Sequence, residues 1–217
     1  MLLKIENINK SFNNIDILKN VSLEIDKSDI ITIFGHSGVG KSTLLSIVSG
    51  MLTLNSGKII INNIEMNKLN NSSIRKKHMG ILFQKNNLLS EFNVRDNLLL
   101  PLIINNKPYN DAVNRVDDLL NLLNLSNLIC RKPGTLSRGE YQRISLLKSI
   151  ANEPAIVIAD EPTANLDENN CKQLIDLIVK LNRDLNITFL IASHDKRFSS
   201  ISSKTYKLFD GRLNKNE

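Results

Sequence analysis

The sequence predicts an α/β protein built on a largely parallel sheet, and two observations lead to that fold class. Short apolar, β-branched runs recur along the 217 residues, and segments with helical periodicity stand between them. Strands that alternate with helices favour a parallel sheet. In addition, a glycine-rich loop separates the apolar run 29–34 from a helix expected at 43–48, which is the strand–loop–helix order of a phosphate-binding loop.

The first part of the chain departs from this alternation. Residues 2–8 and 15–25 alternate between apolar and polar side chains as strands do, and Asn13–Asn14 between them is typical of a turn. We therefore expect an N-terminal antiparallel β part beside the parallel core. The other expected elements are strands at 57–62, 79–83, 155–159 and 187–192, a basic turn or short helix at 72–78, a helix at 170–183, and a hairpin at 205–213 that turns at 210–211.

A helical block interrupts the alternating pattern. From 93 to 125, apolar residues recur at helical spacing, with Asp and Asn on the opposite face. Pro101 and Pro108 are expected to break the block into separate helices, because proline lacks the N–H that a helix interior needs. The prediction is a single domain over 1–217, in which a helical subdomain at about 86–150 is inserted into an α/β core at about 1–85 and 151–217.

The loop after the first buried strand carries the pattern G-x-x-x-x-G-K-[ST]. Glycines let its backbone N–H groups approach a polyphosphate, and the helix that follows adds its positive end. Lys41 is expected on the β- and γ-phosphates and the Ser42 hydroxyl on Mg²⁺. The alternative, a chance glycine-rich turn, is disfavoured by the flanking strand and helix, so the core is expected to be that of a P-loop NTPase. The predicted nucleotide-binding residues here are Gly35, His36, Ser37, Gly38, Val39, Gly40, Lys41, Ser42 and Thr43.

Two carboxylates end the buried strand expected at 155–159. Because ligands of parallel sheets lie at the carboxyl ends of the strands, Asp160 and Glu161 are expected near the phosphate loop. Asp160 is expected to hold Mg²⁺ through water, and Glu161 to orient or deprotonate the attacking water. The alternative is a pair of solvated acids at a strand end, which the phosphate loop disfavours.

A third segment, Leu136-Ser137-Arg138-Gly139-Glu140, precedes a helix. It resembles the Leu-Ser-Gly-Gly-Gln signature of ATP-binding cassette ATPases. In that family the signature serine and the backbone N–H groups at the start of the helix face the γ-phosphate of the nucleotide held by a partner subunit. A plain helix N-cap is a physically sound alternative for Ser137.

The resemblance covers the whole chain and implies roles for further residues. Phe12 corresponds to the aromatic that stacks on adenine, and Gln84 to the glutamine that contacts Mg²⁺ and relays to the membrane partner. Asp167 belongs to the loop that crosses the dimer interface, and His194 is the switch histidine at the γ-phosphate. Taken singly, Phe12 and His194 are weak signals, since a lone aromatic or histidine is usually structural. The implied catalytic residues are Lys41, Glu161 and His194, and the implied Mg²⁺ ligands are Ser42, Gln84 and Asp160.

The chain departs from the family signature at two positions. Arg138 replaces the first glycine and Glu140 replaces the glutamine. The retained Gly139 favours an Arg138 side chain that lies outward, so the change bears on turnover and not on the fold. The following helix reads Ser-Leu-Leu-Lys-Ser-Ile where the family has an Ala-Arg-Ala-rich stretch, which we interpret as a packing change.

The formal net charge of the chain is +6. Nucleic acid or an anionic membrane surface attracts a basic protein, but the lysines are scattered and no aromatic platform interleaves with them. A solvated lysine-rich surface is the favoured interpretation, and no nucleic-acid partner is expected. Cys130 and Cys171 lie outside any metal-binding pattern and are expected to be free thiols.

The resemblance implies an enzyme that binds ATP and Mg²⁺, hydrolyses the ATP, and energises integral-membrane permease subunits. It also implies a homodimer that sandwiches ATP, at the cytoplasmic face of the inner membrane. Residues 87–97 and 131–137 are similar to the branch of the family that releases lipoproteins from the inner membrane towards the outer membrane. Two alternatives stay open: a sister branch that serves macrolide-type efflux or a cell-division complex, and an ATPase that acts on DNA or ribosomes.

Overall fold

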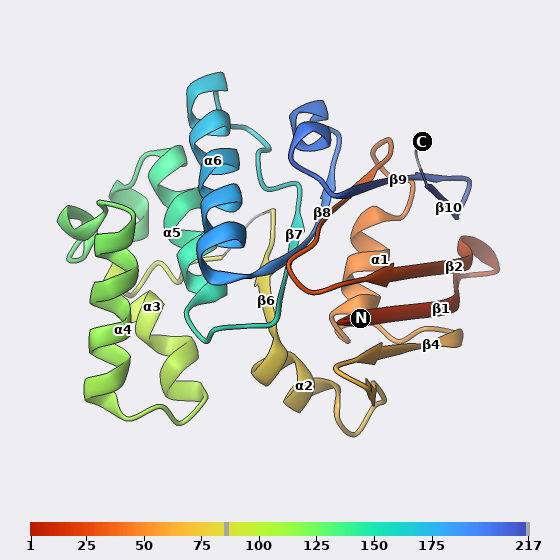
Figure 1. The fold of residues 1–217 in the computed structure, drawn as a ribbon, viewed down its shortest axis with the longest axis horizontal. Coiled ribbons are helices and arrows are strands. Elements are labelled where there is room, and N and C mark those ends of the chain that lie inside the picture. The colour runs from red at the N-terminus through yellow and green to blue at the C-terminus, as the bar shows by residue number, and fades with distance from the viewer. Residues whose placement is uncertain (85–86, 216–217) are drawn as a thin grey trace.

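The computed structural model of the chain describes residues 1–84 and 87–215 and contains two sheets (Figure 1). The antiparallel sheet consists, in spatial order, of β2 (Ile15–Ile25), β1 (Leu3–Phe12), β4 (Ser56–Ile61) and β5 (Ile64–Glu65). The second sheet consists, in spatial order, of β10 (Arg212–Lys215), β9 (Lys204–Phe209), β3 (Ile30–Phe34), β8 (Thr188–Ser193), β7 (Ile156–Asp160) and β6 (Met79–Leu82). Its strands run parallel except β10, which pairs antiparallel with β9. The predicted fold class is confirmed.

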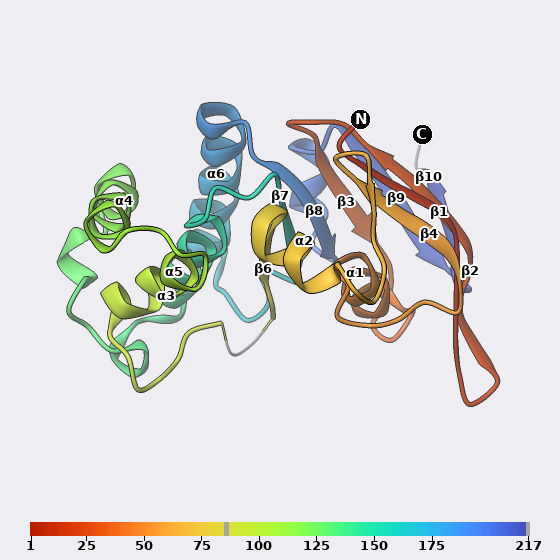
Figure 2. The same cartoon turned by 90° about the horizontal axis from the view of Figure 1, so that it is seen from below.

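Helices lie around the parallel sheet and at one end of the molecule. Figures 1 and 2 show α3, α4 and α5 gathered at the end opposite the antiparallel sheet, with α6 between them and the parallel sheet. Among the described residues, none of the helices has both the length and the apolar character of a membrane span. The helices are α1 (Lys41–Val48), α2 (Asn71–His78), α3 (Val94–Ile104), α4 (Tyr109–Leu122), α5 (Arg138–Ile150) and α6 (Glu168–Leu185), with 3-10 turns η1 (Ser126–Leu128), η2 (Pro133–Thr135) and η3 (Lys196–Ser200).

The parallel sheet separates two hydrophobic clusters. Successive side chains of a strand point to opposite faces, and β8 shows this directly: Phe189 and Ile191 join the cluster with α3 to α6, whereas Leu190 and Ala192 join the cluster with α1 and the antiparallel sheet. The helix α1 therefore packs between the two sheets, which fixes the phosphate loop before it. The division into a core and an inserted helical subdomain stays a prediction.

The expectation that Pro101 breaks the helical block is wrong. Pro101 lies inside α3, while Pro108 is the N-cap of α4, as expected of a helix boundary. A proline in the last turn removes one helical hydrogen bond, the one to the carbonyl of residue 97. Burial of Leu98 and Leu102 stabilises the helix in spite of this loss, and the Pro101 carbonyl accepts a hydrogen bond from Asn152 Nδ2 at 2.7 Å.

Both predicted turns are present. β1 extends beyond its expected end to Phe12, which pairs with Ile15 across the turn. Asn13 and Asn14 have φ of 48° and 62°, and Asp210 has 46°, the left-handed conformation that two-residue hairpin turns require. The extension of β1 places Phe12 at the tip of the hairpin.

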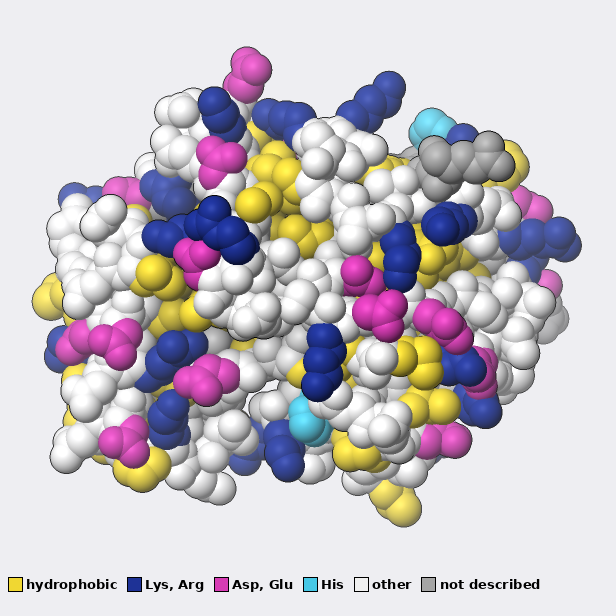
Figure 3. All heavy atoms as spheres, viewed as in Figure 1, with side chains coloured by type: hydrophobic (Ala, Val, Ile, Leu, Met, Phe, Trp, Pro, Cys, Tyr) yellow, Lys and Arg dark blue, Asp and Glu magenta, His cyan; other side chains and the backbone are white. Residues whose placement is uncertain are grey.

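Charges of both signs are interspersed on the surface. On the face shown in Figure 3, Lys and Arg side chains lie among Asp and Glu side chains, with small apolar areas between them. Lys4 and Lys58 both pair with Glu6, at 2.6 and 2.7 Å. This distribution supports the interpretation of the net charge as a solvated surface.

Candidate nucleotide-binding and catalytic site

The phosphate loop connects β3 to α1 in the conformation that its glycines permit. Gly40 caps α1 with φ of 106°, a left-handed conformation that side chains disfavour. A Cβ at Gly35 would lie 2.8 Å from the Leu208 carbonyl oxygen and from Val39 Cγ1. Backbone N–H groups at the start of α1 are therefore open to an anion in the way that the motif predicts.

Four separate parts of the chain meet the phosphate loop in one cleft of about 380 Å³. Phe12 comes from the end of β1, Gln84 from the segment after β6, Glu161 from the end of β7, and His194 from the end of β8. A cleft at the carboxyl ends of parallel strands is where such sheets bind ligands. The lining residues are Phe12, Ile17, Ser37, Gly38, Gly40, Lys41, Ser42, Thr43, Gln84, Glu161 and His194.

Lys41, Glu161 and His194 form a continuous polar chain in this cleft. The Lys41 amine lies 3.2 Å from Glu161 Oε1 and donates to the Gly35 carbonyl at 2.7 Å. Glu161 Oε2 lies 2.8 Å from His194 Nδ1 and accepts from the His194 backbone N–H at 3.3 Å. Both members of the Lys41–Glu161 pair are largely buried, which strengthens their interaction.

Glu161 adopts a backbone conformation that is unfavourable for its residue type. Its φ is 46°, and its N–H donates to the Ala192 carbonyl at 2.8 Å. A left-handed glutamate persists only where its surroundings impose it, and such residues cluster at functional sites. Here the bond to β8 holds the backbone so that the carboxylate lies in the cleft.

Asp160 and Ser42 have the chemistry of a Mg²⁺ site. Asp160 Oδ1 is buried without a hydrogen-bond partner, and the nearby Ser42 hydroxyl favours the ionised form of the same carboxylate, lowering its pKa. Burial raises the pKa of Asp160 and the nearby Glu161 adds to the rise, whereas Ser42 and Lys41 oppose it. A hydroxyl and one orphaned carboxylate oxygen suit an ion that takes few protein ligands and completes its shell with phosphate and water.

Six predicted nucleotide-binding residues do not line this cleft: Gly35, His36 and Val39 belong to the phosphate loop itself, whereas Ser137, Gly139 and Asp167 lie at the starts of α5 and α6. Ser137 caps α5: its Oγ accepts from the Glu140 N–H at 3.3 Å, and the Glu140 carboxylate accepts from the Ser137 N–H at 2.8 Å. Asp167 caps α6 by accepting from the Asn170 N–H at 2.9 Å. The N-cap interpretation of Ser137 is thus confirmed as its role within this chain, and Glu140 completes the capping box.

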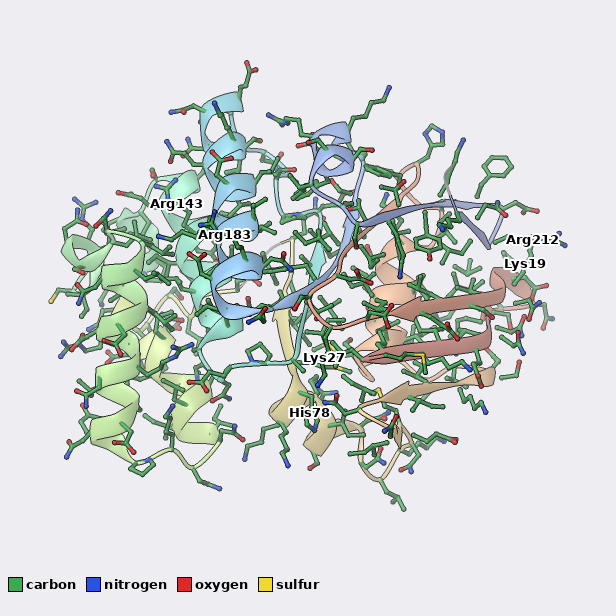
Figure 4. The ribbon with its side chains drawn as sticks, in the orientation of Figure 1. Lys19, Lys27, His78, Arg143, Arg183 and Arg212 are labelled. Carbon is green, nitrogen blue, oxygen red and sulfur yellow. The ribbon has the colours of Figure 1, made fainter. Side chains whose placement is uncertain are left out.

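Gly139 lies against the start of α6. A Cβ at this position would overlap the Asn170 side chain. Arg143, one turn further along α5, donates to Gln173 Oε1 at 2.6 Å and to Asn170 Oδ1 at 3.3 Å, and Figure 4 shows it between α5 and α6. The two helices are therefore fastened at their N-terminal ends.

A second cavity of about 430 Å³ lies between the signature segment and residues 164–166, and Arg138 and Gln84 both line it. Arg138 is exposed, as expected for a side chain that lies outward. Gln84 lines both cavities. Gly35, His36 and His194 line a third cavity, together with residues of η3 and β9.

One link, between the segment after β7 and the segment after β8, was not predicted from the sequence. Thr163 Oγ1 donates to Asp195 Oδ2 at 3.0 Å, and Arg197 Nη2 donates to the same oxygen at 2.8 Å. Burial opposes the ionisation of Asp195, but hydrogen bonds from Arg197 and Thr163 bring its pKa below the usual value. Asp195 follows His194 directly, so the histidine segment is tied to the segment that leads to Asp167. The Ser-His-Asp motif contained this signal.

The cleft, the two sheets and the capped signature helix define an ATP-binding cassette. Residues 18–164 match the profile of the family described as ABC transporter, and the chain belongs to that family. It is an ATPase of this class.

Two relatives that match nearly the whole chain have the same protein name. The chain is 36% identical over 213 residues to the lipoprotein-releasing system ATP-binding protein LolD of Cytophaga hutchinsonii, with 97% of each chain covered. It is 37% identical to the protein of that name from Buchnera aphidicola subsp. Schizaphis graminum, with 100% of this chain and 98% of the relative covered. Among solved structures, it is similar to the ATP-binding cassette MJ0796 in a dimeric post-hydrolysis state bound to ADP and Pi, with a TM-score of 0.89, 29% identity, and 100% and 98% of the two chains covered.

Proposed function

We propose that this chain is the ATP-hydrolysing subunit of a lipoprotein-releasing ABC transporter, peripheral to the inner membrane. The observation that carries the catalytic part is the convergence of Lys41, Glu161 and His194 in one cleft with the phosphate loop. The cargo assignment is supported by the names of the relatives, which match over nearly their whole length.

Each group of residues in the cleft has a different role in hydrolysis. Backbone N–H groups of the phosphate loop and the Lys41 amine hold the β- and γ-phosphates and stabilise the charge that develops during transfer. Glu161 orients the attacking water and accepts its proton. His194, hydrogen-bonded to Glu161, contacts the γ-phosphate and holds the carboxylate in place. Phe12, exposed at the hairpin tip, stacks on adenine.

Mg²⁺ fits the pair of Ser42 and Asp160, with Gln84 as a third residue near it. When bound, Mg²⁺ neutralises charge on the β- and γ-phosphates. Asp160 would have to ionise for this purpose against its burial, which raises its pKa, and the orphaned Oδ1 would supply the acceptor. Among the described residues, no three His, Cys, Asp or Glu side chains form a cluster for a metal ion, which accords with an ion held mainly by the nucleotide.

The functional unit is a homodimer with ATP at the shared interface. Ser137, Gly139 and Asp167 lie outside the cleft of their own chain, although the resemblance assigns them to the nucleotide. A partner copy placed with its signature over the cleft resolves this separation, because the start of α5 then presents its N–H groups to the γ-phosphate. Closure of the dimer drives the permease subunits, and hydrolysis resets them.

Hydrolysis by the purified chain and its Lys41→Ala variant tests the site assignment. Turnover should fall at least ~100-fold, the scale of losing one preorganised charge contact. Lys27→Ala is the matched control, because Lys27 is exposed before β3, away from the phosphate loop that follows β3, and it should leave turnover unchanged. Comparable hydrolysis by the Lys41→Ala variant would refute the assignment.

The cargo is tested by reconstitution with the membrane subunits that co-purify with the chain. ATP-dependent release of lipoproteins from vesicles is expected, and the Glu161→Gln variant should abolish it. Export of a macrolide, or activation of a periplasmic cell-wall hydrolase without release, would instead place the chain in a sister branch.

A further inference from the structure

The amine of Lys148 is held inside the helical block, and within residues 1–84 and 87–215 it has no carboxylate partner. Lys148 lies in the last turn of α5, half-buried, and donates to the Asn87 carbonyl at 2.8 Å and to Asn97 Oδ1 at 3.1 Å. Burial lowers the pKa of Lys148. A half-buried ammonium whose two acceptors within the described residues are neutral oxygens is an unfavourable arrangement for stability alone. Each of these acceptors in turn holds a neighbouring segment.

Asn97, the second acceptor, clamps the segment before α3. Its side chain is fully buried; Oδ1 accepts from the Leu89 N–H at 2.7 Å, and Nδ2 donates to the Leu89 carbonyl at 3.0 Å and to the Phe92 carbonyl at 3.2 Å. Because one amide satisfies both backbone groups of Leu89, this residue is fixed against α3 and cannot shift without leaving buried polar groups unpaired.

Asn87, the first acceptor, fixes the chain beside Gln84. Asn87 Oδ1 accepts from the Phe83 N–H at 2.8 Å, and its Nδ2 donates to the Phe83 carbonyl at 2.7 Å. The next residue, Leu88, donates its N–H to the Tyr141 hydroxyl at 3.1 Å. Tyr141 and Lys148 both belong to α5, so this helix holds Asn87 and Leu88 at two points. The Asn87 side chain in turn fixes the backbone of Phe83, the residue before Gln84.

We propose that Lys148 and Asn97 are positioning residues that place Gln84 in the nucleotide cleft and make it follow the movements of α5. The same helix carries Ser137 at its first end, and α5 spans roughly 20 Å at 1.5 Å per residue. A shift of the signature end on dimer closure is therefore passed to Gln84 through a rigid helix and a short set of hydrogen bonds. This inference rests on the proposed function, since it takes Gln84 as a residue of the Mg–ATP site.

The first test measures the linkage in the nucleotide-free protein. Lys148→Met keeps the length of the side chain and removes both hydrogen bonds, whereas Lys148→Arg keeps a cation that reaches the same acceptors. Backbone amide exchange at Phe83, Leu88 and Leu89 should become about tenfold faster in the Met variant, because their acceptors lose support, and should return towards the wild-type rate in the Arg variant. Unchanged exchange at these amides would overturn the linkage.

The matched control is Lys180→Met. Lys180 is also partly buried and donates one hydrogen bond to a backbone carbonyl, that of Leu122 at 3.0 Å, but it joins α6 to α4. It should leave exchange at Phe83, Leu88 and Leu89 unchanged. If Lys180→Met accelerates these amides as much as Lys148→Met does, the effect is a general loosening and the proposal fails.

The second test asks whether Lys148 acts through Gln84. The half-saturating Mg²⁺ concentration for hydrolysis should rise about tenfold in Lys148→Met, as for a residue that orients a metal-site side chain, with little change in ATP binding measured without Mg²⁺. In a Gln84→Ala background the same substitution should have almost no further effect, since the two would act as one unit. If the effects of Lys148→Met and Gln84→Ala on the half-saturating Mg²⁺ concentration multiply in the double variant, the proposal is overturned. Absence of hydrolysis in the wild type would contradict the proposed function instead, and the amide-exchange result would stand independently.

Discussion

The amine of Lys41 lies 3.2 Å from the carboxylate of Glu161, and the two side chains are only 6% and 13% exposed. Lys41, which we expect to bind the phosphates, and Glu161, which we expect to act as the base, therefore form an ion pair with each other in the absence of nucleotide. A polyphosphate would compete for Lys41 with several charges at once, so we expect its entry to separate the pair and leave Glu161 to His194 and solvent. Nucleotide binding and activation of the base would then be one event.

Glu161→Gln should bind ATP more tightly than the wild type while turnover falls at least ~100-fold. The amide keeps the shape of the side chain but cannot accept the proton, and it no longer repels the γ-phosphate or competes for Lys41. Calorimetry of ATP binding and a phosphate-release assay measure the two effects. Weaker binding by this variant would mean that the Lys41–Glu161 pair supports the nucleotide site and does not compete with it.

The signature should act in trans, and Ser137→Asp tests this without damage to the helix. Aspartate is as good an N-cap as serine, but it places a carboxylate towards the partner's γ-phosphate, a repulsive contact. The chain alone should be inactive. Mixed with Lys41→Ala chains, it should recover hydrolysis, because one site of the mixed dimer is then intact.

Two controls make this mixing experiment decisive. Ser137→Asn is a neutral N-cap and should keep most of the activity. A mixture of wild type with the Ser137→Asp, Lys41→Ala double variant places one defect in each site of a mixed dimer and should not gain activity from mixing. Recovery in that mixture, and not in the first one, would show that signature and phosphate loop act within one chain.

Asp160→Asn should raise the melting temperature of the nucleotide-free protein at neutral pH. Burial raises the pKa of Asp160 above 3.8, its ordinary value, so above that pH the folded state binds more protons than the unfolded chain. The free energy of unfolding therefore decreases as the pH rises through the window between the two pKa values. The gain from Asp160→Asn should be about 2–4 °C per kcal/mol relieved, and it should shrink as the pH falls towards 4.

The stabilisation by Mg–ATP should be smaller in this variant than in the wild type, since the proposed Mg²⁺ ligand is lost. Thermal scans at several pH values, with and without Mg–ATP, measure both effects. Asp176→Asn, at an exposed position on α6, is the control. A lower melting temperature for Asp160→Asn in the absence of nucleotide would show that the carboxylate stabilises the fold.

Phe12→Ala should weaken ATP binding about tenfold, the scale of one aromatic–base stack. The ring is 44% exposed at the hairpin tip, with the Lys10 amine 4.8 Å from its centroid. Because every base has a π-face, GTP should lose as much affinity as ATP, whereas tripolyphosphate should lose none. Equal losses for all three ligands would indicate a distorted hairpin and not a lost stack.

Local patterns predicted the phosphate loop well, because strand, glycines, lysine and helix follow one another directly. The pairing of Lys41 with Glu161 was not predictable in this way, since it depends on the strand order β3-β8-β7. The prediction that Pro101 ends a helix was wrong for a related reason. The effect of proline is local, whereas the burial that keeps α3 helical comes from α5 and its neighbours.

The hydrogen bonds of Asn97 and Lys148 were also outside the reach of the sequence pattern. Both residues interrupt apolar helical faces, and spacing alone gives no sign of which polar groups they meet. The sequence alone indicates a packing change where the family has an arginine-containing stretch, yet Lys148 in this stretch donates a hydrogen bond to the Asn87 carbonyl. The sequence shows where Asn97 and Lys148 stand in their helices, but it does not show which groups their side chains contact.

The packing of Gly139 on Asn170 has a consequence for how this signature can change over evolutionary time. Any side chain at 139 would have to move the Asn170 side chain, which is hydrogen-bonded to Asp167 and Arg143. Its neighbour Arg138 faces solvent and carries no such restriction. The two adjacent positions of the motif are therefore under different structural constraints, since 138 accommodates a large exposed side chain and 139 does not unless Asn170 rearranges.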